Sequence, residues 1–168
     1  MSQEIRFPVQ IDGIIFHEHA FSAKGRNCSY ESIASLKFQI QNTTINFSTD
    51  ETYFFGIRLC NDEVITISVS DAAFSFNKKK VAQKKRNLLA IANHINGLTF
   101  NRRLDEYLEQ MRATGCVQYK VPSEGLFSSK LNTIFIYENG DVSLAGKTAN
   151  LKRARAAGIL KYRTAYGL

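Results

Sequence analysis

Apolar and polar residues alternate through much of the first 70 residues, which is the pattern of half-buried β-strands. In the segment around Leu36, Phe38 and Ile40, each apolar residue is followed by a polar one. The same alternation recurs at about 10-residue spacing in Ile45/Phe47, Phe55/Ile57/Leu59 and Ile65/Ile67/Val69. The pattern predicts four strands in an antiparallel meander with one solvated face.

Short polar segments separate these strands and predict the turns between them. We expect tight turns at Asn42-Thr43, at 48–51 and at 61–63. Before the meander, strands are expected at 14–16 and 20–23, next to turns at Asp12-Gly13 and Lys24-Gly25. The first half of the chain is therefore predicted to be β-structure.

The period changes from two to 3.6 at residue 77, and the segment 77–97 is predicted to be a helix. Val81, Leu88, Ala92 and Ile95 fall on one face, which we expect to cover the apolar face of the meander. Lys84 and Lys85 flank this face, so their stems can lie along it with the ammonium groups in water.

A second helix is expected after a stop at Asn96-Gly97, with Thr99 as its N-cap and Gly115 at its end. Its apolar positions follow helical spacing, and Arg102 is placed to pair with Glu106. These apolar positions are Leu104, Tyr107, Leu108 and Met111.

The last part of the chain predicts short strands. One is expected at 117–121, and a loop at 122–130 follows it. Strands at 133–137 and 142–144 flank Asn139-Gly140, which is a strong hairpin signal. Asn150 is a candidate cap for a short basic helix that ends at Gly158, and 159–166 is a candidate closing strand.

The order of these elements resembles the pleckstrin-homology-like superfold, especially its bacterial members. Over residues 12–96, the segment 13–16 would open the roll, and Tyr30 with Ile33 matches an aromatic-x-x-Ile pattern at the entry to its third strand. The resemblance implies an α+β fold in which a helix caps an antiparallel β-roll or barrel. We expect two domains, a PH-like roll at 1–97 and an appended helix, hairpin and basic segment at 98–168.

Charge divides the chain into two unequal halves. Residues 1–77 hold 5 Lys and Arg against 9 Asp and Glu, whereas residues 78–168 hold 17 against 6, and no acid follows Asp141. The overall charge is +7. Such an asymmetry indicates either an anionic partner or a solubilising surface.

The candidate binding residues for an anionic partner are the cations of two segments, which we expect to form one basic surface. They are Lys78, Lys79, Lys80, Lys84, Lys85, Arg86, Lys152, Arg153, Arg155, Lys161 and Arg163. Three interpretations stay open for them: a solvated helix start, phosphate contacts with nucleic acid, or attraction to an anionic membrane surface.

The sequence supplies little catalytic chemistry. His17 and His19 would lie on one face of a strand, but the spacing offers no further ligand, so we expect no metal site there. His94 is expected to be solvated. Nucleotide-binding, hydrolase and metalloprotease motifs are missing, and we expect no cofactor.

Cysteine use favours a reducing compartment. Cys28, Cys60 and Cys116 are odd in number and have no paired spacing, so we expect small buried side chains and no disulfide. The first residues also show no basic region followed by an apolar run, which would mark a signal peptide. We therefore expect a cytoplasmic protein.

The leading hypothesis is a non-enzymatic binding or adaptor module that acts through protein contacts on a PH-like scaffold. The alternatives are a nucleic-acid-binding protein that uses the basic second half, and a peripheral protein on anionic membranes. Phosphate contacts would make affinity fall steeply with salt, which distinguishes nucleic-acid binding from apolar protein contacts.

Overall fold

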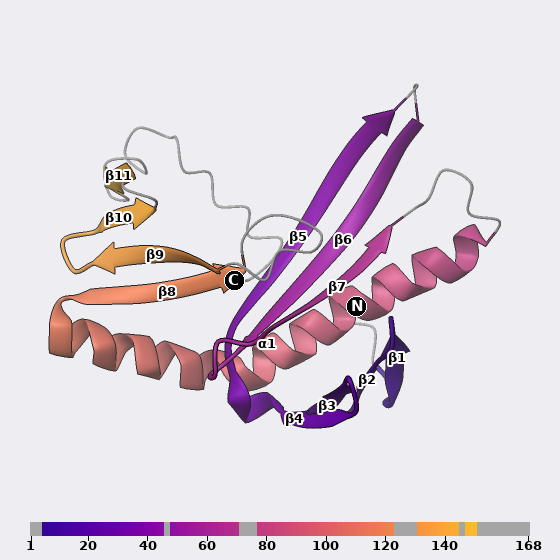
Figure 1. The fold of residues 1–168 in the computed structure, drawn as a ribbon, viewed down its shortest axis with the longest axis horizontal. Coiled ribbons are helices and arrows are strands. Elements are labelled where there is room, and N and C mark those ends of the chain that lie inside the picture. Colours follow the sequence, from indigo (N-terminus) through magenta and orange to yellow (C-terminus); the bar gives the residue numbers. More distant parts are fainter. Residues whose placement is uncertain (1–4, 46–47, 71–76, 123–130, 145–146, 151–168) are drawn as a thin grey trace.

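A computed structural model of the chain describes residues 5–45, 48–70, 77–122, 131–144 and 147–150. They form an α+β fold of three antiparallel sheets and one long helix (Figure 1). The described strands form open sheets, so the closed roll or barrel expected from the sequence is not seen in this part of the chain. No helix in the described ranges combines the length and the apolarity that crossing a membrane requires.

The N-terminal sheet contains β1 (Val9–Ile11), β2 (Ile14–Phe16), β3 (Ala20–Ala23) and β4 (Arg26–Ser29) in sequential order. Both predicted turns are confirmed. Asp12-Gly13 and Lys24-Gly25 each have two consecutive residues at positive φ, as two-residue hairpins with the favoured twist require. The inward side chains of this sheet are buried, and those of Phe16 and Phe21 are fully buried.

A single 3₁₀ turn, η1 (Tyr30–Ser32), leads into the meander of β5 (Ile33–Ile45), β6 (Ser48–Leu59) and β7 (Val64–Ser70). The meander is confirmed, but it has three strands where four were predicted. The predicted turns at Asn42-Thr43 and 48–51 are wrong, because Asn42 pairs with Glu51 and Thr43 with Asp50 in one continuous ladder. These polar residues lie in a ribbon that extends beyond β7, where polar side chains are compatible with strand (Figure 1).

The helix α1 (Lys78–Thr114) is a single element of 37 residues, where two helices were predicted. Asn77 caps its start by accepting a hydrogen bond from the Lys80 amide at 3.2 Å, and Gly115 ends it in the left-handed conformation. The predicted stop at Asn96-Gly97 and the capping role of Thr99 are wrong. The Thr99 hydroxyl instead donates to the Ile95 carbonyl, within the helix.

Tertiary contacts explain why the helix continues through Gly97. Beyond this residue, Thr99 and Arg103 are buried. Arg102 donates to the carbonyl of Ile33, and Tyr107 donates to that of Ala34 at 3.1 Å. The predicted pair of Arg102 with Glu106 is confirmed. Together these contacts outweigh the roughly 0.5–1 kcal/mol that a helical glycine costs. The domain boundary at 97–98 stays a prediction, and α1 runs across it.

The third sheet contains β8 (Cys116–Pro122), β9 (Leu131–Tyr137), β10 (Asp141–Leu144) and β11 (Lys147–Asn150) in the order β11-β10-β9-β8. The strand at 117–121 and the hairpin at Asn139-Gly140 are confirmed. Asn150 ends a strand and donates to Asp141 at 2.6 Å. The helix and strand predicted for 151–166 lie outside the described residues.

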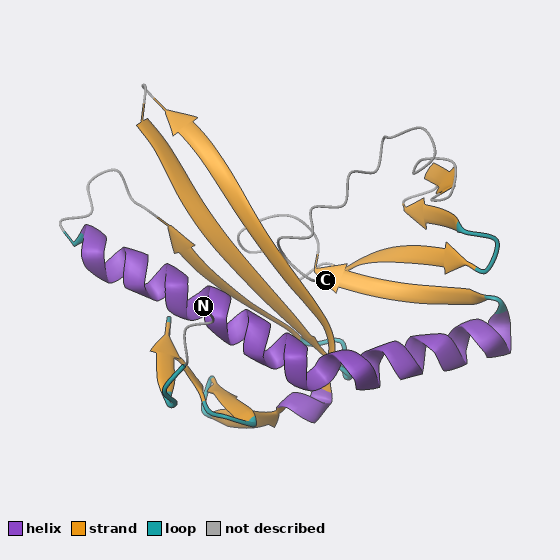
Figure 2. Ribbon diagram, turned by 180° about the vertical axis from the view of Figure 1, so that it is seen from behind, coloured by secondary structure: helices purple, strands orange, loops and turns teal. Residues whose placement is uncertain are grey.

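The main core lies where β1–β4 and the meander both pack on the first half of α1 (Figure 2). Leu88, Ile91, Ala92 and Ile95 are buried there, and Val81 packs at the edge, so the predicted apolar stripe is confirmed. The second half of α1 extends past this core and lies along β8 (Figures 1 and 2). A cavity lies between this half of α1 and the C-terminal sheet.

Truncating a buried side chain of the main core should destabilise the protein. Leu88→Ala and Ile57→Ala each remove a fully buried side chain and should lower the free energy of unfolding by about 2–5 kcal/mol in denaturant titration. Leu98, 49% exposed on the same helix, is the matched control, and Leu98→Ala should change stability by no more than about 0.5 kcal/mol. Equal effects at Leu88 and Leu98 would contradict the assigned helix face.

The continuity of α1 can be tested at Gly97. Its φ is not positive, and a Cβ added there would meet nothing within 4 Å. Gly97→Ala should therefore raise the free energy of unfolding by about 0.4–1 kcal/mol. Gly115→Ala is the control and should destabilise the protein, because Gly115 has φ of 67°. Destabilisation by both substitutions would indicate a helix break at Gly97.

Candidate functional site

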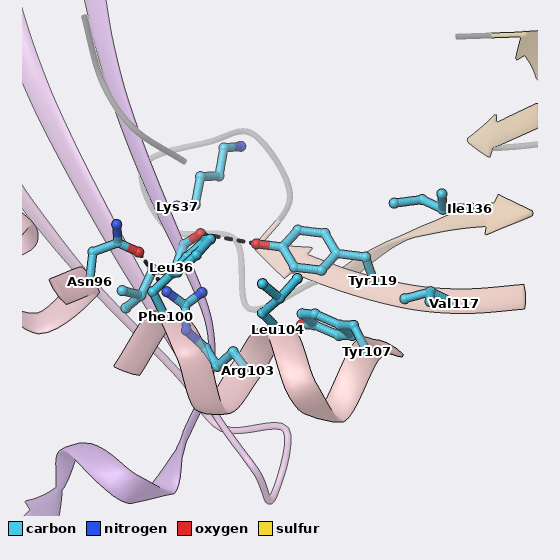
Figure 3. Close-up of a pocket in the computed structure, with 10 residues that line it drawn as sticks. All are labelled: Leu36, Lys37, Asn96, Phe100, Arg103, Leu104, Tyr107, Val117, Tyr119 and Ile136. Atoms are coloured by element: carbon cyan, nitrogen blue, oxygen red, sulfur yellow. Dashed lines mark hydrogen bonds between the residues drawn. The ribbon is translucent and has the colours of Figure 1, made fainter. Parts of the chain in front are cut away.

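A cavity of about 500 Å³ lies between the second half of α1, the start of β5 and the strands β8 and β9 (Figure 3). This volume lies within the range of ligand pockets in proteins, and the walls are mostly apolar. The lining residues come from four elements and are Leu36, Lys37, Asn96, Phe100, Arg103, Leu104, Tyr107, Val117, Tyr119 and Ile136.

Two tyrosines form an aromatic wall of the cavity. The rings of Tyr107 and Tyr119 meet edge to face with centroids 5.3 Å apart. Their hydroxyls donate to carbonyls of β5, Tyr107 to Ala34 at 3.1 Å and Tyr119 to Leu36 at 3.4 Å. Burial raises the pKa of both phenols, so both donate as neutral groups. The two hydroxyls are thus bound to the backbone of β5, and the two rings line the cavity.

These hydrogen bonds are available because β5 is an edge strand of the meander. Its pairing with β6 also shifts between Ile33 and Ser35. A buried edge must satisfy its carbonyls in another way. Side chains of α1 and β8 do so, which fixes the helix and the C-terminal sheet against β5.

A charged network holds β8 to the meander beneath the cavity. The buried Arg58 donates through Nε to the Ser35 hydroxyl and to the Lys120 carbonyl, both at 3.1 Å. Its Nη1 donates to Asp62 at 2.7 Å, and Lys120 Nζ contacts the second oxygen of Asp62 at 2.6 Å. Ser35 completes the network by donating to the Lys120 carbonyl at 2.7 Å. These bonds place β8, and with it one wall of the cavity.

Arg103 is one of two cationic residues in this mostly apolar lining, and unlike Lys37 it is buried. Its side chain is 6% exposed. Nε donates to the Thr99 hydroxyl at 3.1 Å, and Nη2 donates to the Asn96 side-chain oxygen at 2.6 Å. Burial lowers the pKa of the guanidinium, because desolvation disfavours its charge. Both hydrogen-bond partners are neutral, and the nearby charges of Glu106 and Arg102 pair with each other, so Arg103 is oriented without an ion pair of its own in the described residues.

The predicted basic residues of α1 are dispersed around the helix. Lys78, Lys79 and Lys80 are exposed in its first turn. Lys84 lies 3.7 Å from Asp12, and the exposed Arg86 donates to Gln83 within the helix.

Lys85 corrects an expectation. Its ammonium was expected in water, but the side chain is buried, with Nζ 3.3 Å from Glu51 and 5.0 Å from the centre of the Tyr53 ring. The cations of the second segment, Lys152, Arg153, Arg155, Lys161 and Arg163, lie outside the described residues. A connected basic surface therefore stays a prediction.

The predicted strand pair His17 and His19 lies instead in the turn between β2 and β3, with both side chains exposed. The described ranges hold no group of three or more His, Cys, Asp or Glu placed to hold a metal ion. The expectation that His94 is solvated is wrong. Its ring packs on Phe7 at 4.8 Å, and Nε2 lies 2.8 Å from the Glu18 carbonyl.

The cysteines are free thiols. Cys28 and Cys116 are half-buried, whereas Cys60 is exposed, so the expectation of a buried side chain is wrong at Cys60. All three lie outside the cavity lining.

Sequence reasoning did not identify the cavity, although it selected some of its residues. The helical spacing marked Leu104, Tyr107 and Leu108 as an apolar stripe, which suggested core. Leu104 and Leu108 are instead 40% and 43% exposed. One signal for the cavity was available in the sequence. Phe100 and Leu104 make the apolar surface of the helix wider than contact with a single core requires.

Comparisons with protein-family models, with curated proteins and with solved structures gave no match to this chain. The site is therefore interpreted from its own residues.

The carboxylate of Asp62, which binds Arg58 and Lys120, should make the free energy of unfolding depend on pH. Hydrogen bonds from Lys120 and Arg58 lower the pKa of Asp62 below its ordinary value of 3.8. The unfolded chain therefore binds this proton first as the pH falls, and the stabilisation is complete above about pH 4 and lost below it. Asp62→Asn should remove it while keeping a residue that tolerates the φ of 63°.

We expect the parent to be more stable than Asp62→Asn at neutral pH, and the difference to shrink when urea unfolding is repeated below about pH 4. Asp105, an exposed acid on α1, provides the control, and Asp105→Asn should show a smaller difference at neutral pH. A difference for Asp62→Asn that stays constant into acid would show that its carboxylate is not held by the two cations.

Proposed function

We propose that this protein is a non-enzymatic binding module that acts through protein contacts, and that the apolar cleft along α1 is its binding site. The cleft consists of the cavity, whose lining includes the partly exposed Phe100 and Leu104, and the exposed Leu108 one turn further along α1. The observation that carries the proposal is this continuity of cavity and exposed apolar surface. Large apolar side chains gathered at the surface mark interaction sites.

The composition of the lining supports binding over catalysis. Within the described residues, the lining includes no carboxylate, imidazole or thiol. Nucleophilic and acid–base catalysis depend on such groups most often. Aromatic side chains in a pocket are instead the usual anchors of a protein interface.

We further propose that residues 12–96 are a PH-like scaffold. The order of short strands, meander and helix supports this assignment. In this interpretation, the first half of α1 is the capping helix, and its continuation carries the cleft away from the scaffold. The binding site then belongs to the additional elements of this chain, since most of the lining comes from 96–136.

Nucleic-acid binding is the second candidate, and the exposure of Lys78, Lys79 and Lys80 favours it. Three cations in the first turn oppose the helix dipole, and each lowers the stability of the helix by about 0.3–1 kcal/mol. The cost suggests a use for their charge. An anionic membrane surface would use the same residues.

The proposal is tested by selecting ligands from a phage-displayed library of random short peptides on the intact protein. Leu104→Ser should weaken the selected peptides by about tenfold or more in fluorescence anisotropy, as expected for a residue central to an interface. Leu98→Ser is the matched control, because Leu98 is a similarly exposed leucine outside the lining, and it should leave affinity unchanged.

Two outcomes would contradict the proposal. One is that the selected peptides lose affinity equally in both leucine variants. The other is that no peptide binds, while duplex DNA is shifted in gels with an affinity that falls steeply with salt. The second outcome would favour the nucleic-acid alternative.

A further inference from the structure

The charge of Arg103 distinguishes it from the other buried cations. Three basic side chains are buried in the described residues: Arg58, Lys85 and Arg103. Arg58 pairs with Asp62, and Lys85 pairs with Glu51. Arg103 has no Asp or Glu within 4.0 Å in the part of the chain that the structure describes. Burying an unbalanced charge is costly, so a cation retained in this way indicates an anion that arrives from outside.

Hydrogen bonds within the helix restrain the guanidinium of Arg103 in one orientation. Thr99 and Asn96 lie on the preceding turns and bind Nε and Nη2, which restrains the guanidinium. Nη1 makes no hydrogen bond within the described residues. Figure 3 shows the group among the lining side chains, near Asn96 and Leu36. An orientation fixed before binding lowers the entropy that a ligand has to pay.

We propose that the cleft binds a peptide segment of a partner protein that combines apolar side chains with one carboxylate, and that Arg103 receives the carboxylate. This inference rests on the proposed function and specifies the chemistry of its partner. A planar guanidinium in an apolar site is suited to carboxylate recognition by charge-assisted hydrogen bonds. The apolar side chains of the peptide would pack on Phe100, Leu104 and the tyrosine wall.

The surroundings favour a peptide over a nucleic-acid phosphate. Phosphate contacts are made by cations at the surface, whereas Arg103 is buried in the wall of a mostly apolar cavity. The exposed apolar rim next to the cavity also offers contacts to a ligand longer than the cavity itself. The overall charge of +7 would attract an acidic segment from a distance.

The experiment uses the peptides selected on the intact protein. We expect Asp or Glu at one recurrent position, next to apolar residues. Replacing that residue by Asn or Gln in the peptide should weaken binding to the parent protein by about tenfold, the scale of a buried charge pair. This measurement uses the unmodified protein, so it does not depend on the folding of a variant.

The same amide peptides are then measured on Arg103→Gln. If the carboxylate meets Arg103, neutralising the peptide should change affinity for this variant by less than about twofold, because the pair is already broken. Arg103→Lys, which keeps the charge but not the planar donor geometry, should retain part of the preference for the acidic peptide. Without ligand, Arg103→Met should lower the melting temperature less than Arg58→Met does, because Arg58 loses an ion pair with Asp62 whereas Arg103 loses only hydrogen bonds to neutral groups.

The outcomes separate the two proposals. Peptides that need Leu104 but show no acid preference would overturn the carboxylate inference and leave the proposed function in place. Peptides that bind equally well to the Leu104→Ser variant would overturn the proposed function. An acid preference that persists unchanged in Arg103→Gln would assign the carboxylate to another cation. Displacement of every selected peptide by myristate at lower concentration would assign the cleft to a free fatty acid.

Discussion

The packing of one helical stripe against the meander is the contact on which the rest of the structure depends. Leu88, Ile91 and Ile95 are fully buried, and each contributes about 1.5–3 kcal/mol relative to an exposed side chain. This contact fixes the direction of the first half of α1. Because an α-helix is stiff, it also fixes the direction of the second half, which carries the C-terminal sheet and the cavity.

The second half of α1 is held by a different kind of interaction. Its contacts with β5 include side-chain hydrogen bonds from Arg102 and Tyr107 to strand carbonyls, and β8 is held by the Asp62 network. Polar bonds of this kind place elements accurately without consuming apolar surface. Phe100 and Leu104, on the same half of the helix, remain 44% and 40% exposed. Under the proposed function, the first half of the helix stabilises the fold and the second half provides the binding surface.

The sequence predicted the elements well where periodicity or turn chemistry acted alone. Alternation identified the meander, the positive-φ turns identified the first hairpins, and Asn139-Gly140 identified the last one. Prediction failed at Asn42-Thr43 and at Asn96-Gly97, where local preference favoured a break. In both places contacts with another segment determine the structure. At Asn42-Thr43 these are the pairs with β6, and beyond Asn96-Gly97 they are the contacts of α1 with the edge of β5.

The candidate site could not be predicted in the same way. Periodicity shows that a helix face is apolar, but it does not show whether another element covers that face. At 3.6 residues per turn, Leu104 falls on a different face of the helix from the buried Leu88, and only the structure shows that this second apolar face is left 40% exposed at Leu104. The burial of Arg103 without an acid is likewise a tertiary property, since the neighbouring Arg102 pairs with Glu106 on the same helix.

The charge asymmetry of the chain acquires a more specific meaning in the structure. Several cations of the basic second half meet acids of the first half: Lys84 lies near Asp12, Lys85 near Glu51 and Lys120 near Asp62. Part of the asymmetry is therefore complementarity between two segments that pack together, and these cations are not available as a uniform basic surface. Complementarity of this type ends at Arg103, because the first half contributes Leu36 and Lys37 to the described lining and no acid. Attraction between opposite charges holds the two halves of the chain together elsewhere. Under our proposal, the same attraction at Arg103 binds the carboxylate of another molecule.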